Sequence, residues 1–156
     1  MARILISKHN SASLNRLWDS LGDAHEIHCV DNPAEAIMFL RQPGLNIDLV
    51  ITSVYDDDID LFAFIKALKR DPLLRQIPLL CFSMQRSHCA TLLDTNMEHA
   101  AIACGADKYL SMDSFCKVKN DIESCETCAW PGELCDYEAL RHAVEALLPR
   151  KGGLVP

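Results

Sequence analysis

Short apolar runs alternate with helix-like patterns along most of this chain, and this alternation limits the possible fold more than any other feature. Residues 48–53 (Asp-Leu-Val-Ile-Thr-Ser) and 77–83 (Ile-Pro-Leu-Leu-Cys-Phe-Ser) are almost continuously apolar, as strands of a parallel sheet are when both faces are buried. Between such runs, apolar residues recur at helical spacing. Because strands that alternate with helices indicate βα units, we expect an α/β domain built on a parallel sheet.

Start and stop signals place the individual elements. Asn32 before Pro33 is a strong helix start, since asparagine caps a helix well and proline suits its first position. Asp136 provides a second cap, before the last helix. The expected strands are residues 3–7, 25–30, 48–53, 77–83 and 107–110. The expected helices are residues 11–21, 33–40, 61–68, 87–103, where a break is allowed, and 136–148. In the first helix, Leu14, Leu17, Trp18 and Leu21 are expected on the core face.

Length and composition indicate one globular domain. The chain has 156 residues, of which 49% are hydrophobic and 24% charged. No apolar run reaches the roughly 18 residues of a membrane span, and the N-terminal apolar run is too short for a signal peptide. A net charge of −7 argues against a nucleic-acid surface. We therefore expect a cytoplasmic protein without a membrane or nucleic-acid partner, with the domain at residues 2–149 and an appended tail at 150–156.

The third expected strand and the loop after it resemble the receiver domains of response regulators in two-component signalling. In that family the strand ends on the phosphate-accepting aspartate, and a second aspartate follows seven residues later. Asp60 keeps the later position here, whereas Ser53 stands at the earlier one. Residues 100–110 are similar to the family's Gly-Ala-Asp-x-Tyr-Leu segment. The resemblance covers residues 2–149 and implies a flavodoxin-like fold: a five-stranded parallel sheet of order 2-1-3-4-5, helices on both faces, and a site at the carboxyl ends of the strands.

The resemblance also implies that the receiver chemistry has been lost. Receivers bind Mg²⁺ with an acidic pair, attack phosphorus with the strand aspartate, and contact the phosphoryl oxygens with a Ser or Thr and a Lys. The corresponding positions here are Lys8 and His9 for the acidic pair, Ser53 for the nucleophile, Ser83 for the retained hydroxyl, and Met112 for the lysine. We therefore expect no Mg²⁺, no phosphate acceptance and no enzymatic activity. The acidic residues 56–58 are interpreted as a solvated loop before the next helix, not as a replacement site.

An insertion at about residues 111–135 contains four cysteines. Cys116, Cys125, Cys128 and Cys135 lie there, including the Cys-Glu-Thr-Cys pair at 125–128. The segment has little apolar content, so ordering it requires a cross-link. Four thiolates bind either a tetrahedral zinc or an iron–sulfur cluster, and the spacing of the cysteines does not distinguish the two. The remaining hypothesis is that the cysteines form disulfides or are uncoordinated thiols. Of the other cysteines, Cys29, Cys81 and Cys104 are interpreted as small apolar residues, whereas Cys89 is left unassigned.

We thus interpret the chain as a receiver-like signalling or regulatory module that accepts no phosphate and carries a four-cysteine metal site. In receivers, the fourth helix, fifth strand and fifth helix form the face that binds partners or a second copy, and the insertion lies beside this face. Two alternatives remain. One is a thiol–disulfide redox protein that uses Cys125 and Cys128. The other is a flavodoxin-like cofactor domain, for which residues 7–13 would form a phosphate loop.

Overall fold

The computed structural model describes residues 1–7, 17–54, 61–83, 88–117 and 135–148, with the backbone alone at 88–94 and 112–113. Among the residues expected to carry function, Lys8, His9, Cys125 and Cys128 lie outside these ranges. The acidic residues 56–58 and the tail at 150–156 also lie outside them.

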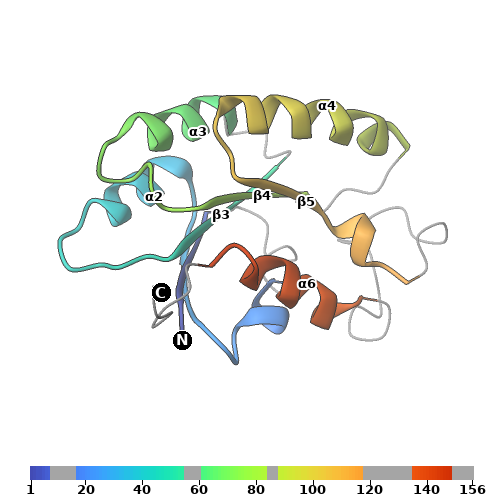
Figure 1. Cartoon of the computed structure of the whole chain (residues 1–156), viewed down its shortest axis with the longest axis horizontal. Helices are drawn as coiled ribbons and strands as arrows, with labels where there is room; N and C mark the ends of the chain where they lie inside the picture. Colours follow the sequence, from blue (N-terminus) through green and yellow to red (C-terminus); the bar gives the residue numbers. More distant parts are fainter. Residues whose placement is uncertain (8–16, 55–60, 84–87, 118–134, 149–156) are drawn as a thin grey trace, which may run out of the picture.

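Within the described ranges, five parallel strands form one sheet in the order 2-1-3-4-5, which confirms the expected fold class (Figure 1). The central strands are buried along almost their whole length, since helices cover both faces. This burial explains their continuous apolar sequences. The strands are β1 (Arg3–Ser7), β2 (Glu26–Val30), β3 (Leu49–Ser53), β4 (Leu79–Ser83) and β5 (Lys108–Ser111).

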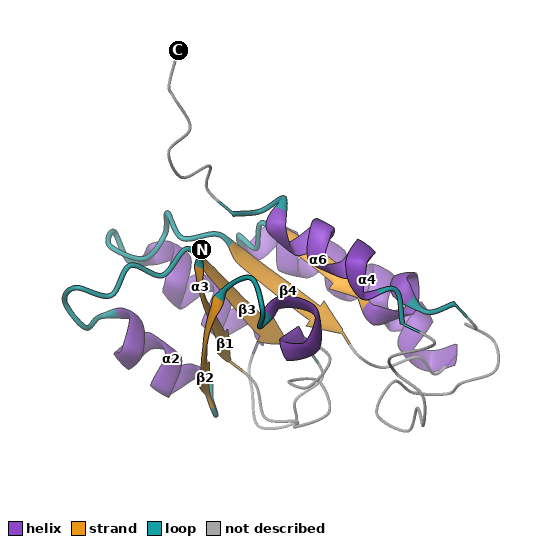
Figure 2. Ribbon diagram, turned by 90° about the horizontal axis from the view of Figure 1, so that it is seen from below, coloured by secondary structure: helices purple, strands orange, loops and turns teal. Residues whose placement is uncertain are grey.

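The helices cover the two faces of the sheet unequally. One face packs against α2 (Pro33–Leu40), α3 (Leu61–Arg70) and α4 (His88–Cys104). The other packs against the helical residues 17–21 and α6 (Tyr137–Glu145). Figure 1 shows α3 and α4 on one side of the sheet and α6 on the other, and Figure 2 shows the same sandwich turned by a right angle.

The buried residues of α3 form one stripe along the helix. In α3 the buried residues are Leu61, Phe64, Ile65 and Leu68, which lie three or four positions apart. Both predicted caps are confirmed. The Asn32 side chain accepts a hydrogen bond from the Glu35 backbone N–H, and the Asp136 side chain accepts one from Ala139.

Several expectations are corrected by the structure. Trp18 is 48% exposed, although it was expected on the core face of its helix; Leu17 and Leu21 occupy that face, and the indole lies beside Gly22, where a Cβ would come within 2.9 Å of it. The fourth helix runs without a break from His88 to Cys104. Part of the irregular stretch after β5 is a 3₁₀ helix, η1 (Met112–Phe115). Leu147 and Leu148 follow α6 and are half-buried. None of the described helices is long and apolar enough to cross a membrane.

A histidine joins the beginning of the chain to its last helix. The Ala2 backbone N–H donates to His25 Nδ1 at 3.2 Å, and His25 Nε2 lies 2.9 Å from Glu145 Oε1. Since Nδ1 accepts a hydrogen bond, the proton belongs on Nε2, which then donates to the Glu145 carboxylate. The ring thus fixes the end of α6 against the start of β1.

The Gly-Ala-Asp segment at 105–107 has a structural role that does not depend on phosphate chemistry. Gly105 ends α4 with φ +121°, and a Cβ placed there would lie 2.8 Å from Lys69 Cγ. Asp107 Oδ2 accepts hydrogen bonds from Lys69 Nζ and from the Leu79 backbone N–H, both at 2.8 Å. Lys69 Nζ also donates to the carbonyl oxygens of Arg75 and Ile77. This Lys69–Asp107 node ties together α3, the entrance of β4 and the turn before β5.

Replacing Gly105 with alanine is expected to lower the free energy of unfolding by about 2–4 kcal/mol, because the Cβ meets both an unfavourable φ and the Lys69 side chain. Gly44 provides a matched control: its φ is +85°, but its Cβ would meet nothing within 4 Å. In the Gly44→Ala variant the free energy of unfolding should therefore fall only because of the unfavourable φ, by about 1 kcal/mol. Urea denaturation measures both variants, and equal losses would refute the role of the Lys69 contact.

Candidate functional site

Serines terminate four of the strands at the carboxyl edge of the sheet. Strands β1, β3, β4 and β5 end on Ser7, Ser53, Ser83 and Ser111. In open α/β sheets ligands bind outside this edge, where the loops after the strands meet. A site of the kind found in other open α/β sheets would therefore lie beside these strand ends.

Three hydroxyl groups near this edge are fully buried. Ser7, Thr52 and Ser83 have 0% exposure, and their hydroxyl oxygens have no hydrogen-bond partner within the described part of the chain. Ser7 and Thr52 are neighbours in the parallel register of β1 and β3. By alternation along their strands, all three side chains point to the α2, α3 and α4 face. The edge thus presents neutral hydroxyl groups where carboxylates would be needed to bind a divalent cation.

Three of the five residues that align with the receiver site lie within the described ranges. Ser53 is the last residue of β3 and is half-buried; its register neighbour on β4 is Phe82. Ser83 is buried at the end of β4. Met112 begins η1 directly after Ser111, so its backbone lies at the same edge of the sheet. The structure thus brings Ser53, Ser83 and Met112 to neighbouring strand ends, whereas Lys8 and His9 lie outside the described residues.

Two of the four insertion cysteines lie opposite each other. Cys116 and Cys135 form an isolated antiparallel bridge, and both are buried, with exposures of 8% and 5%. Cys135 packs in the core cluster on the α6 face of the sheet. Sequence spacing gave no sign of this pairing, since the two residues flank the whole segment 117–134. Within the described ranges, these two cysteines included, no group of three or more His, Cys, Asp or Glu side chains is arranged to bind a metal.

The remaining cysteines divide between core and surface. Cys81 is fully buried in β4, and burial raises the pKa of its thiol to about 12, so it is an inert core residue as expected. Cys104 is half-buried and packs against the same core. The expectation for Cys29 was wrong: this residue is exposed near the carboxyl end of β2, which is an edge strand of the sheet.

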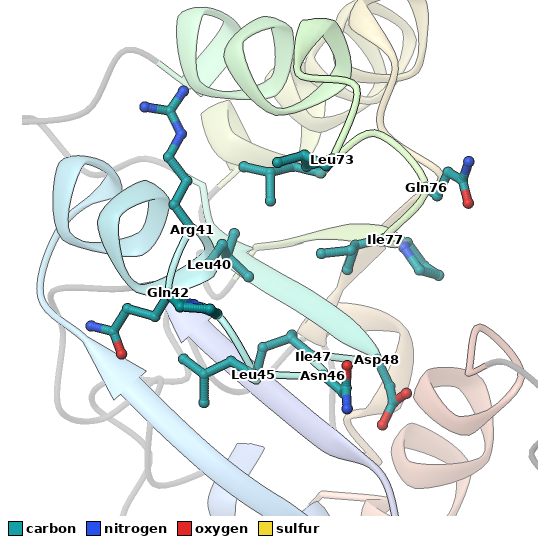
Figure 3. A pocket seen from close by; sticks show the side chains of 13 residues that line it. Leu40, Arg41, Gln42, Leu45, Asn46, Ile47, Asp48, Leu73, Gln76 and Ile77 are labelled. Carbon is teal, nitrogen blue, oxygen red and sulfur yellow. The ribbon is translucent and has the colours of Figure 1, made fainter.

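A pocket lies at the opposite, amino-terminal edge of the sheet. It has a volume of about 570 Å³ and opens between the segments that lead into β3 and β4 (Figure 3). Beside it, the Leu73 backbone N–H and the Arg41 guanidinium hold the pKa of Asp71 below its ordinary value. The walls are mainly Leu40, Leu45, Ile47, Leu73, Leu74, Ile77 and two prolines, with polar side chains from Arg41, Gln42, Asn46, Asp48 and Gln76.

No protein-family model matches the sequence, and no curated protein matches it. Solved structures do match. The phosphorylated cyanobacterial phytochrome response regulator RcpA is 16% identical, with a TM-score of 0.67 over 92% of this chain and 91% of that one. A signal receiver domain of a histidine kinase from Syntrophus aciditrophicus is 22% identical, with a TM-score of 0.63 over 100% and 95%. The chemotaxis response regulator CheY4 of Vibrio cholerae is 17% identical, with a TM-score of 0.64 over 95% and 99%.

These matches span nearly the whole length of both chains, so the protein has the fold of response-regulator receiver domains. The resemblance inferred from the third strand and from residues 100–110 is therefore confirmed at the level of fold. At sequence identities of 16–22%, these matches show the fold alone.

The buried hydroxyl of Thr52 leads to a stability prediction. Thr52→Val keeps the side-chain shape and removes a buried oxygen, so the free energy of unfolding should stay within about 0.5 kcal/mol or rise. Thr52→Ala also removes a methyl group and should lose about 1 kcal/mol. Urea denaturation tests both variants. A loss of about 1–3 kcal/mol for the valine variant would show that the hydroxyl is bonded to a residue outside the described ranges.

Proposed function

We propose that this chain is a signalling or regulatory module of receiver fold that acts through protein contacts and accepts no phosphate on β3. The observation that carries the proposal is Ser53 at the carboxyl end of that strand. A serine hydroxyl is a weak nucleophile unless a base takes its proton. Its chain neighbours, Thr52 and Val54, and its register neighbour Phe82 are not bases.

The charges at this edge support the same proposal. Phosphoryl transfer in receivers depends on Mg²⁺, a hard cation that binds carboxylate oxygens. The buried groups of the edge are the neutral hydroxyls of Ser7, Thr52 and Ser83. In the sequence, Lys8 and His9 follow β1 and would add positive charge instead of ligands. Mg²⁺ is therefore not part of the proposed function.

We expect no acyl phosphate to form when the protein is incubated with acetyl phosphate and Mg²⁺, because no carboxylate stands at the end of β3. Intact mass spectrometry at neutral pH measures incorporation directly. A stoichiometric gain of one phosphoryl group that is lost in hydroxylamine would contradict the proposal.

Two variants identify the acceptor if phosphate is incorporated. Loss of labelling in Ser53→Ala would place the phosphate on the serine. Loss of labelling in a variant with Asp56, Asp57 and Asp58 all replaced by asparagine would place it on the acidic loop.

The second part of the proposal is a metal site formed by Cys116, Cys125, Cys128 and Cys135. Its support is the antiparallel bridge that brings Cys116 and Cys135 together at the base of the insertion. Two thiolates held by a fixed backbone would lower the ordering cost of a four-cysteine site. The metal is zinc or the iron of an iron–sulfur cluster, since both bind four thiolates.

Metal analysis of protein purified without oxygen tests this part. Stoichiometric zinc would support a structural site, whereas iron with acid-labile sulfide and visible absorption would support a redox-sensing cluster. A Cys116→Ser variant should lose most of the bound metal, and Cys29→Ser, which changes an exposed cysteine of β2, should retain it. Protein that contains neither metal would refute the site.

The third part is a docking face formed by α4, β5 and α6, for a protein partner or a second copy of the chain. Its support is Ile102 of α4, an apolar side chain that is 44% exposed and so available for contact. The cysteine insertion joins β5 to α6 and so borders the same face.

If two copies associate through this face, Ile102→Glu should weaken the dimer at least tenfold, because it places a charge in an apolar contact. Sedimentation equilibrium measures the dissociation constant. Met38→Glu is the matched control, since Met38 is 71% exposed on α2, away from this face. Equal weakening by both variants would contradict the assignment, and a monomeric wild-type protein would exclude the second copy as the partner.

A further inference from the structure

The hydrogen bond beside Cys116 and Cys135 defines how the two residues face each other. In an antiparallel pair, opposite residues either exchange two backbone hydrogen bonds or lie between such bonds. Here the N–H of Asp136, which follows Cys135, donates to the carbonyl oxygen of Phe115, which precedes Cys116, at 2.7 Å. The cysteines are therefore a non-hydrogen-bonded pair, the type in which Cα atoms are closest, about 4.5 Å apart.

This geometry suits a direct bond between the sulfur atoms. Disulfides join cysteines whose Cα atoms are roughly 4.4–6.8 Å apart, with side chains on the same side of the backbone. Opposite residues of an antiparallel pair meet the second condition, because their side chains point the same way. Both cysteines are also mostly buried, with exposures of 8% and 5%, so their side chains have little room to point apart.

We propose that Cys116 and Cys135 form a reversible disulfide that fixes the beginning of α6 against the end of β5. This goes beyond the proposed function, because it requires neither phosphate chemistry nor a metal. The oxidant is a low-molecular-weight disulfide such as oxidised glutathione. One cysteine thiolate attacks it and releases one glutathione thiol. The second thiolate attacks the resulting mixed disulfide at the protein sulfur and releases the other. Two cysteine thiols are oxidised, and one glutathione disulfide is reduced to two thiols.

The position of the pair explains what the bond would control. Cys116 follows η1, which continues directly from β5, and Cys135 immediately precedes Asp136, the N-cap of α6. Asp136 thus contributes both the bond to Phe115 and the cap of the helix. In the reduced protein, the backbone hydrogen bond from Asp136 to Phe115 joins the residue before Cys116 to the residue after Cys135. A disulfide would join the two cysteines covalently and close residues 117–134 into a loop. The thiol state would therefore act on the proposed docking face.

Disulfide mapping of the full chain tests the pairing. Protein stripped of metal by a chelator is equilibrated with glutathione buffers of increasing oxidised fraction and alkylated, then digested with trypsin and a glutamate-specific protease. Cleavage after Lys117, Glu126 and Glu133 places Cys116, Cys125, Cys128 and Cys135 on four different peptides. We expect the Cys116 peptide to be joined to the Cys135 peptide. The Cys29→Ser variant should give the same result, and in Cys135→Ser the Cys116 peptide should instead carry glutathione. Linkage of Cys116 to Cys125 or Cys128, or no linkage, would overturn the pairing.

Amide hydrogen exchange tests the coupling to α6. The N–H of Ala139, which donates to the Asp136 side chain at 3.0 Å, should exchange roughly fivefold more slowly after oxidation. Cys135→Ser should show no such change. Equal rates in the reduced and oxidised protein would refute the coupling even if the disulfide forms.

Adding zinc before the oxidant separates this proposal from the metal site. If zinc suppresses a linkage that forms in metal-stripped protein, the same thiols bind metal and both proposals stand. If the linkage forms equally with zinc present, the disulfide stands and the zinc form of the metal site fails.

Discussion

Burial of the central strands on both faces is the constraint on which the rest of this structure depends. Leu49, Ile51, Leu80 and Phe82 face α6, while the residues between them face α3 and α4. The backbone groups of a strand buried in this way have no access to water, so they must pair with neighbouring strands, which are parallel here. Parallel neighbours in turn need crossover helices, which supply the two outer layers. The layers of Figure 1 follow from this requirement.

The same constraint decides where function can lie. The two faces of the sheet are filled by side chains, which leaves the two edges where strands meet loops. At the amino edge, the Lys69–Asp107 node and the Arg41–Asp71 pair are used to join the turns that lead into the strands. At the carboxyl edge, the strand ends carry serines, and the hydroxyls of Ser7 and Ser83 are fully buried. These neutral groups are the observation behind the proposal that the chain accepts no phosphate on β3.

The end of β5 is where this chain adds something to the fold. The backbone bond from Asp136 to Phe115 closes a segment that begins and ends with a buried cysteine. Because Asp136 also caps α6, the proposed change at the two sulfur atoms would reach the first turn of that helix. Metal binding and disulfide formation are two proposed ways to strengthen the contact between Cys116 and Cys135. Either would place an input beside the face formed by α4, β5 and α6.

The sequence by itself determined the elements and their order. Continuous apolar runs identified β3 and β4, the Asn32-Pro33 and Asp136 caps fixed two helix starts within a residue, and Ser53 with Asp60 led to the receiver resemblance. These signals are local, since they depend on periodicity and on backbone conformations of adjacent residues. Only the tertiary structure decided which residues meet across the chain. It exposed Cys29 on an edge strand and turned Trp18 out of the core; it also joined Lys69 to Asp107 and placed Cys116 opposite Cys135. The physical reason is that these outcomes depend on strand order and on space already filled by other side chains, which no local pattern records.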